Sequence, residues 1–216
     1  MRGAIFVSVV LAAVGAQAQV TLFNSSDPAN NAATRTAWLA AAGVAAPDFL
    51  EDFESYAIGT SLQSVSLIGG ATITDSNATP VISVQSSSTF FGGSVPFGKG
   101  LALRETHAYT FAFAAPISYF GMYDIDQGGS SFRVFLADSS FVDFSGLDST
   151  ASSGSSGEFV GFVAVGPMIT SIQFNADGGD NEVGIDELQY GAAVPEPTTM
   201  IALALGAAVV GRRKRK

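Results

Sequence analysis

The decisive stretch for the fold reads Glu158-Phe159-Val160-Gly161-Phe162-Val163-Ala164-Val165. Successive side chains of a β-strand point to opposite faces, and both alternating sets of residues here are apolar. A strand with two apolar faces must be covered on both sides. The stretch therefore predicts a buried strand, and the Ser/Gly-rich residues 149–157 before it predict a hairpin connector.

Similar segments rich in Phe, Val, Ile and Thr surround this one, separated by clusters of Gly, Ser and Asp. Alternation is clear at Phe111 and Phe113, and again at Phe132, Val134 and Leu136. We expect strands at 49–54, 71–74, 80–85, 101–105, 109–114, 117–123, 132–137, 141–144, 158–165, 169–174 and 183–190. No internal repeat is visible, which disfavours solenoids and propellers. About eleven strands in one domain predict an all-β fold, an antiparallel two-sheet β-sandwich of the jelly-roll type.

One short N-terminal helix is predicted before these strands, in the Ala-rich segment Thr34–Gly43. Thr34 is its candidate N-cap and Gly43 its candidate terminator. Trp38 and Leu39 are the expected packing anchors.

The charge of the chain lies mostly in its central part. Residues 19–194 contain eighteen acids and four strong bases, a net charge of −14. Such a body repels nucleic acid and anionic membrane surfaces, so we expect no nucleic-acid partner. The chain has no cysteine, which excludes disulfides, thiolate metal sites and a cysteine nucleophile.

The N-terminus has the pattern of a secretory signal. Met1-Arg2 precedes an apolar stretch at residues 4–15, and Ala16-Gln17-Ala18 follows it. A charged start, an apolar segment and an A-x-A site predict a signal peptide over residues 1–18, cleaved after Ala18. The Sec translocon is then a partner of the chain.

The C-terminus has three parts in order. Val194-Pro195-Glu196-Pro197 is a helix-breaking start, because proline cannot continue a helix. The apolar segment 200–211 follows and predicts a short anchor helix of about 18 Å, against about 30 Å for a bilayer core. Its large apolar residues are Met200, Ile201, Leu203, Leu205, Val209 and Val210. The basic residues Arg212, Arg213, Lys214, Arg215 and Lys216 close the chain and predict a cytoplasmic stop.

This series resembles the PEP-CTERM sorting signal over residues 194–216. The resemblance implies that Pro195, Glu196 and Pro197 are recognised by an exosortase, a membrane processing enzyme, in a setting of exopolysaccharide and biofilm production. It implies a body held in the periplasm by a transient inner-membrane anchor and then passed to the cell surface or extracellular matrix. The chain is then divided into a signal peptide (1–18), a helical lead-in (19–48), a jelly-roll domain (49–193) and a sorting tail (194–216).

A second resemblance lies in the body. Asp52-Phe53-Glu54 and Gly184-Ile185-Asp186-Glu187-Leu188 are similar to the first and last strands of carbohydrate-binding and MAM-type jelly-roll modules. In many of those folds these strands pair and hold a structural cation, which implies a Ca²⁺ site at Glu54 and Asp186. Acidic residues also cluster at Asp124 and Asp126 and in the segment 175–182, which contains Asp177 and Asp180. The alternative to a cation site is that this segment is a solvated acidic turn.

Other residues give weaker signals. The single histidine, His107, is expected at the surface, and Tyr56, Tyr109, Tyr119 and Tyr123 are candidates for a sugar-binding face. No nucleophile elbow, phosphate loop or zinc spacing is present. We therefore expect a non-enzymatic exported surface or matrix protein with polysaccharide as candidate ligand, no catalytic residues and no cofactor beyond the Ca²⁺. The alternatives are a secreted glycan hydrolase and a purely structural matrix or coat component.

Overall fold

A computed structural model describes residues 19–25, 28–77, 82–86, 98–104, 106–125, 130–147, 157–175 and 182–192. The predicted signal peptide and the predicted sorting tail lie outside the described residues. Within the described part, no helix is long and apolar enough to cross a membrane.

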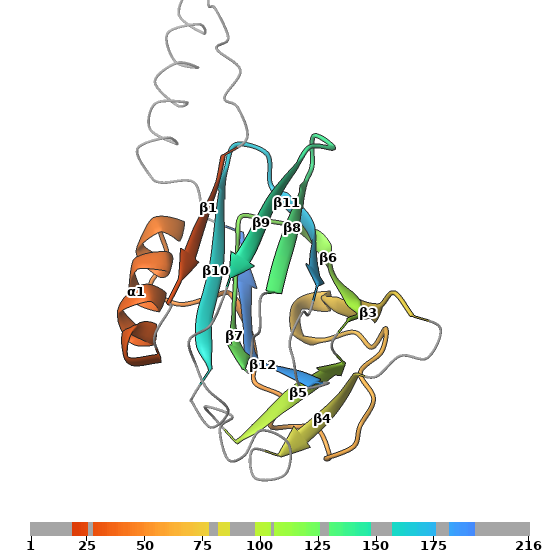
Figure 1. Ribbon diagram of the computed structural model, residues 1–216. Helices are drawn as coiled ribbons and strands as arrows, with labels where there is room; N and C mark the ends of the chain where they lie inside the picture. The colour runs from red at the N-terminus through yellow and green to blue at the C-terminus, as the bar shows by residue number, and fades with distance from the viewer. Residues whose placement is uncertain are drawn as a thin grey trace, which may run out of the picture.

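The described residues form two antiparallel sheets that face each other (Figure 1). Sheet A has seven strands in the order β1-β10-β7-β12-β5-β4, with β2 paired to β12. Sheet B has five strands in the order β3-β6-β11-β8-β9. The strands are β1 Gln19–Asn24, β2 Phe49–Glu51, β3 Thr72–Asp75, β4 Ile82–Ser86, β5 Lys99–Arg104, β6 Ala108–Ile117, β7 Tyr119–Ile125, β8 Ser130–Leu136, β9 Phe141–Leu147, β10 Glu158–Val165, β11 Ile169–Asn175 and β12 Glu182–Gly191.

The strand order confirms the jelly roll. From β5 to β12 each strand lies in the other sheet from the strand before it, except that the consecutive strands β8 and β9 both lie in sheet B and pair with each other. Sheet A contains β5-β12-β7-β10 and sheet B contains β6-β11-β8-β9, the arrangement of two interlocked Greek keys. β2, which directly precedes Asp52-Phe53-Glu54, pairs with the end of β12 from Leu188 to Tyr190, whereas residues 52–54 themselves lie in the turn after the strand.

The core lies between the sheets and is largely aromatic. Phe132 stacks on Phe174 with ring centroids 4.8 Å apart, and Phe111 lies 5.4 Å from Phe120 of the other sheet. These four rings are at most 1 % exposed. The predicted alternation is confirmed in β8, where Phe132, Val134 and Leu136 are buried while the residues between them are partly exposed.

The helix α1 (Asn31–Ala42) covers the outer face of sheet A, beside β1 and β10 (Figure 1). It begins earlier than predicted, so Thr34 is not its N-cap. Asn31 explains the earlier start, because its side chain accepts the Phe159 N–H at 2.9 Å and donates to the Gly157 carbonyl at 2.9 Å. The helix ends as predicted at Gly43, whose φ of 72° is left-handed.

Trp38 is the residue that fastens α1 to the sheet. It is fully buried, and its Nε1 donates to the Phe162 carbonyl at 3.2 Å. The ring lies over Gly161 and Gly121, where an added Cβ would come within 2.7 Å and 3.1 Å of it. Glycine in two adjacent strands therefore makes the flat seat that the indole requires.

Two segments differ from the sequence prediction. β1 lies within residues 19–48, where only a helical lead-in was expected, and it pairs with β10 over its whole length. The strand predicted at 49–54 ends at Glu51, because Phe53 has a φ of 58° and the chain turns there. The buried Glu51 carboxylate holds this turn by accepting the N–H groups of Phe53 and Ile68.

Candidate functional site

The outer face of sheet B, on the side away from the core, carries polar side chains in register. Residues directly opposite each other in antiparallel strands point to the same face. The pairing therefore places one row across all five strands, with about 19 Å between its ends at four strand spacings. This row consists of Thr74, Thr110, Gln173, Arg133 and Asp143.

A groove of about 450 Å³ lies over the β8, β9 and β11 part of this face. Its lining offers hydroxyl, amide, guanidinium and carboxylate groups, whereas its two phenylalanines point their rings into the core. The lining residues are Ser131, Phe132, Arg133, Asp143, Phe144, Ser145, Gln173 and Asn175. Hydrogen-bonding groups on a rigid sheet can recognise a polyhydroxylated ligand, since each donor and acceptor is held at a fixed position.

An ion pair is the most ordered feature of the groove. The Arg133 guanidinium binds both carboxylate oxygens of Asp143, at 2.7 Å from Nε and 2.9 Å from Nη2. This contact lowers the pKa of Asp143 and raises the pKa of Arg133. Both groups are half-exposed, so the pair adds little to stability. The pairing nevertheless holds the guanidinium and the carboxylate in a fixed orientation in which both remain accessible to solvent.

Phe141 supplies an aromatic surface beside this pair. It is 53 % exposed, and the Arg133 guanidinium carbon lies 4.4 Å from its ring centroid. Phe135, its cross-strand neighbour, lies 6.3 Å away. The face thus combines an exposed ring with polar groups in a row.

The tyrosines proposed for a sugar-binding face lie elsewhere. Tyr109 and Tyr119 are fully buried, Tyr123 is 6 % exposed, and Tyr56 is half-buried with its hydroxyl donating to Glu51. Burial raises the pKa of Tyr119 to about 12. Sequence reasoning missed Phe141, although the alternation of Phe141 and Asp143 with the apolar Val142 and Phe144 could have placed it on an outer face.

Asp186 is the most perturbed carboxyl group described. It is fully buried on the outer face of sheet A, directly opposite Tyr123. Its Oδ1 accepts the Glu187 N–H at 2.7 Å, whereas its Oδ2 has no hydrogen-bond partner. Burial raises its pKa to about 8, and the charges of Glu187, Glu54 and Asp52 add to this shift.

The predicted cation site stays a prediction. Glu54 is near enough to Asp186 to influence its pKa, but its Oε1 accepts the Lys99 N–H at 2.6 Å. Among the described residues, no group of three or more His, Asp or Glu side chains is arranged to hold a metal ion. Three further acids of the sequence clusters, Asp126, Asp177 and Asp180, lie outside the described residues.

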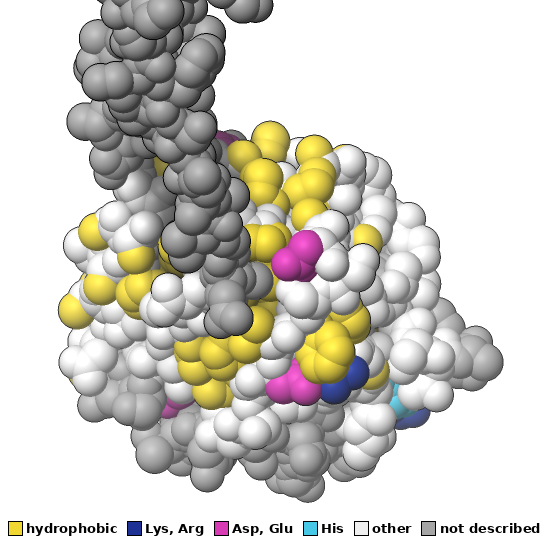
Figure 2. All heavy atoms as spheres, turned by 90° about the horizontal axis from the view of Figure 1, so that it is seen from above, with side chains coloured by type: hydrophobic (Ala, Val, Ile, Leu, Met, Phe, Trp, Pro, Cys, Tyr) yellow, Lys and Arg dark blue, Asp and Glu magenta, His cyan; other side chains and the backbone are white. Residues whose placement is uncertain are grey.

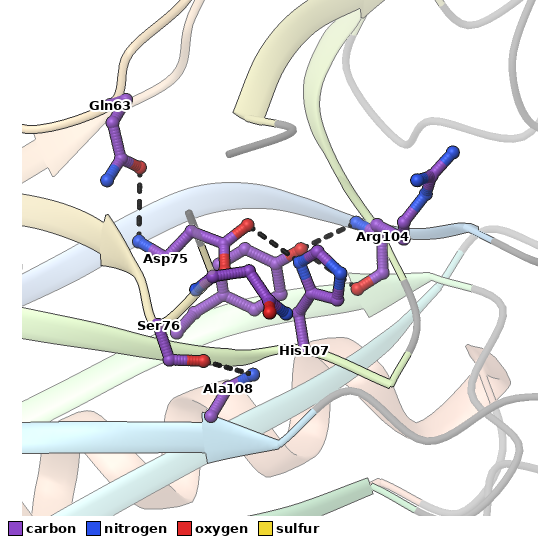
Figure 3. A network of polar contacts seen from close by, with 8 residues as sticks. Gln63, Asp75, Ser76, Arg104, His107 and Ala108 are labelled. Atoms are coloured by element: carbon purple, nitrogen blue, oxygen red, sulfur yellow. Dashed lines mark hydrogen bonds and ion pairs between the residues drawn. The ribbon is translucent and has the colours of Figure 1, made fainter. Parts of the chain in front are cut away.

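The sequence predicted that His107 lies at the surface, but in the structure its side chain is largely buried. Its side chain is 12 % exposed, and its Nδ1 lies 2.8 Å from Oδ2 of the buried Asp75 (Figure 3). Gln63 and Ser76 accept neighbouring backbone N–H groups, so the contact fastens the turn between β5 and β6 to the end of β3. This arrangement is local and structural.

Solved structures share parts of this architecture. The K2 cleaved adhesin domain of Lys-gingipain matches at 13 % identity and a TM-score of 0.41, over 66 % of this chain and 98 % of that one. A carbohydrate-binding module from Clostridium stercorarium in complex with cellobiose matches at 13 % identity and a TM-score of 0.33, over 67 % and 93 % of the two chains. The module TmCBM61 in complex with β-1,4-galactotriose matches at 7 % identity and 0.37, over 61 % and 91 %. Likeness at this level carries no conclusion about function.

No curated protein sequence matches the chain. A family model for the PEP-CTERM protein-sorting motif matches residues 193–216, which confirms the resemblance seen in the tail. The chain therefore carries a PEP-CTERM sorting motif at its C-terminus, and this motif implies that it is an exported protein.

Proposed function

We propose that the chain is an exported, exosortase-processed surface or matrix protein whose sheet B binds a neutral polysaccharide without cleaving it. The observation that supports this most directly is the polar row across five strands, with Arg133, Asp143 and the exposed Phe141 at one end. Aromatic faces pack against the apolar faces of sugar rings, while guanidinium, carboxylate and amide groups bind hydroxyls.

The charge of the site favours a neutral ligand. The base in the groove, Arg133, is already neutralised by Asp143. The body as a whole carries a net charge of −14, since residues 19–194 contain eighteen acids and four strong bases. An anionic polysaccharide would therefore be repelled at long range and would find no unpaired base in the lining.

The composition of the groove also favours binding over hydrolysis. Glycosidases need a pair of carboxylates flanking the scissile bond. The groove is lined by one carboxylate, Asp143, and its contact with Arg133 lowers its pKa, which disfavours a role as general acid. The second candidate function, a glycan hydrolase, would require measured turnover of a polysaccharide.

The binding proposal is tested by affinity electrophoresis in gels that contain a neutral β-glucan, a neutral galactan or acidic alginate. We expect a neutral polymer to retard the protein, and Arg133→Ala and Phe141→Ala to abolish this retardation. Ile58→Ala is the matched control, because Ile58 is 57 % exposed and contributes nothing to the groove. Equal retardation of all variants, or release of reducing sugar, would count against the proposal.

The sorting part of the proposal has its own test. Cleavage after Ala18, a transient anchor formed by residues 200–211 and a cytoplasmic stop at 212–216 predict two trimmed ends. The intact mass of the mature protein, isolated from a host with an exosortase, should lack both the signal peptide and the residues after the Pro195-Glu196-Pro197 site. A mass equal to that of the whole chain would contradict it.

We also propose that Glu54 and Asp186 hold Ca²⁺. The support is the buried Oδ2 of Asp186, which has no hydrogen-bond partner in the described structure. A bound cation would supply the missing partner and allow the carboxylate to ionise. Backbone carbonyls and water complete the oxygen shell in many such sites.

A further inference from the structure

The two ends of the described body lie at the same end of sheet A. Strand pairing places Thr21, Val163, Tyr119 and Gly191 in one row across β1, β10, β7 and β12. Three strand spacings separate Thr21 from Gly191, about 14 Å. β1 begins two residues before this row, and β12 ends in it at Gly191. Both predicted processing segments therefore connect to the same end of the sandwich.

The exit of the chain at this end is closely held. The Ala192 N–H donates to Asp48 Oδ2 at 3.0 Å, and the Asp48 N–H donates to the Tyr119 hydroxyl at 2.9 Å. The Ser118 N–H donates to the Gly191 carbonyl at 2.8 Å. A Cβ on Gly191 would overlap both the Asp48 carboxylate and the Tyr119 hydroxyl. The chain is thus fixed up to Ala192, next to the first residue of the sorting motif.

The length of chain beyond this point limits how far the body can stand from a membrane. Eight residues lead from Ala192 to Met200, where the apolar segment begins. Even fully extended, they reach about 28 Å. Part of that reach lies within the polar headgroup layer, about 6 Å thick on each side. The end of the sandwich therefore stays within about 20 Å of the headgroups.

Exposed apolar side chains gather at this end. Phe49, Leu50, Ile68 and Val165 are 37–59 % exposed. Phe49 lies beside Tyr190, and the Tyr190 hydroxyl donates to the Ile68 carbonyl. Val165 follows Ala164, whose N–H donates to Ser118 next to the chain exit. Figure 2, seen from above, shows several hydrophobic patches on this end and few charged side chains.

We propose that this membrane-facing end, defined by Phe49, Leu50, Ile68 and Val165, rests on the surface of the bilayer that holds the sorting tail. The proposal depends on the proposed function, because the tail must first be in the membrane. An acidic body is repelled from anionic headgroups, so contact is made where acids are few and apolar side chains are exposed. The strands of sheet A then point toward the membrane, and the groove on sheet B stays open at the side.

The chain has no cysteine, so single cysteines can report contact with lipid. Leu50→Cys and Val165→Cys are labelled with an environment-sensitive fluorophore in the full chain, reconstituted into phosphatidylcholine vesicles that contain a quencher-bearing lipid. Ile58→Cys is the matched control, because Ile58 is 57 % exposed and Val165 is 59 % exposed. Ile58 lies toward the opposite end of sheet A, because the N–H of the next residue, Gly59, donates to the Val84 carbonyl. Val84 is in register with Leu101 and Ile185, and Ile185 lies six residues before Gly191 along β12. That row lies about 20 Å from the membrane-facing end.

We expect blue-shifted emission and strong quenching at positions 50 and 165, and neither at position 58. Vesicle flotation separates the two levels of the proposal. If the protein does not float, the anchoring function fails and this inference fails with it. If it floats but positions 50 and 165 are not quenched, or all three positions are quenched equally, only the orientation is overturned. An emission shift without lipid that grows with protein concentration would also overturn it, in favour of self-association.

Discussion

The outer face of sheet A is covered by a helix, whereas the outer face of sheet B is open to solvent. On sheet A, Gly121 and Gly161 leave a flat surface on which Trp38 lies, and α1 removes the face from solvent. On sheet B, the corresponding outward positions carry Thr, Gln, Arg and Asp, and they remain open. The comparison shows that glycine in adjacent strands lets a helix pack closely on a sheet, whereas solvated polar side chains leave a face accessible to a ligand. Each prediction below tests this contrast.

The largest expected effect is loss of the cover on sheet A. Trp38→Ala removes a fully buried indole and its hydrogen bond to Phe162, and should cost about 3–5 kcal/mol of unfolding free energy in urea titration. Phe141→Ala on the open face is the control and should change that free energy by less than about 0.5 kcal/mol. Similar losses for both variants would mean that the two faces do not differ as described.

The second prediction concerns Asp186, beneath the covered side of sheet A. Its pKa of about 8 lies above that of an ordinary aspartate, so between these values the folded state binds more protons than the unfolded state. Stability contributed by this group is therefore complete below about pH 4 and is lost as the pH rises toward about 8, by up to about 4 kcal/mol at pH 7. Urea titrations in EDTA should show this slope for the native chain and not for Asp186→Asn.

Calcium should raise the stability of the folded protein through the same carboxyl group, whereas a rise in pH lowers it. If Glu54 and Asp186 hold Ca²⁺, adding the ion at pH 8 raises the melting temperature of the native chain, and chelation lowers it. Asp186→Asn should not respond. A melting temperature that is the same in Ca²⁺ and EDTA would remove the cation proposal while leaving the pH prediction intact.

The fourth prediction makes one substitution on each sheet. Gly161→Ala places a Cβ 2.7 Å from the Trp38 ring and should cost about 1–3 kcal/mol through overpacking. Gly146→Ala in β9 meets no atom within 4 Å, and only its φ of 69° opposes the change, at about 1 kcal/mol. Thermal unfolding of the two variants compares a packed position with an open one. A smaller loss for Gly161→Ala would show that the Trp38 seat is loose.

The smallest expected effect on stability is at Arg133. The ion pair with Asp143 is half-exposed, so Arg133→Ala should change the unfolding free energy by less than about 0.5 kcal/mol. Arg133→Lys retains the charge but loses the two-point contact with Asp143. It should weaken polysaccharide binding without affecting melting. A large loss of stability in either variant would show that the groove is part of the structural framework.

Much of the fold followed from local pattern. β10 was predicted with its observed bounds, because a strand that is apolar on both faces leaves little choice of position. The end of α1 at Gly43 was also predicted, since glycine adopts the left-handed turn that stops a helix. β1 was missed because its six residues depend for their structure on pairing with β10, about 140 residues away along the chain.

The candidate site was largely beyond sequence reasoning. The tyrosines with polar hydroxyls were the obvious choices for sugar binding, yet burial removed them from the surface. Gln173, Arg133 and Asp143 are separated in sequence and come together only through the register of β11, β8 and β9. A shift of one residue in that register would turn each side chain to the other face.

By itself, the sequence determined the sorting tail, the acidic body and the all-β sandwich, because charge, apolar runs and alternation are properties of neighbouring residues. Only the tertiary structure decided which outer face is covered, which aromatic rings remain exposed and where the chain leaves the body. Those outcomes depend on the pairing of distant strands, since a side chain's neighbours across a sheet are set by register and not by its place in the chain.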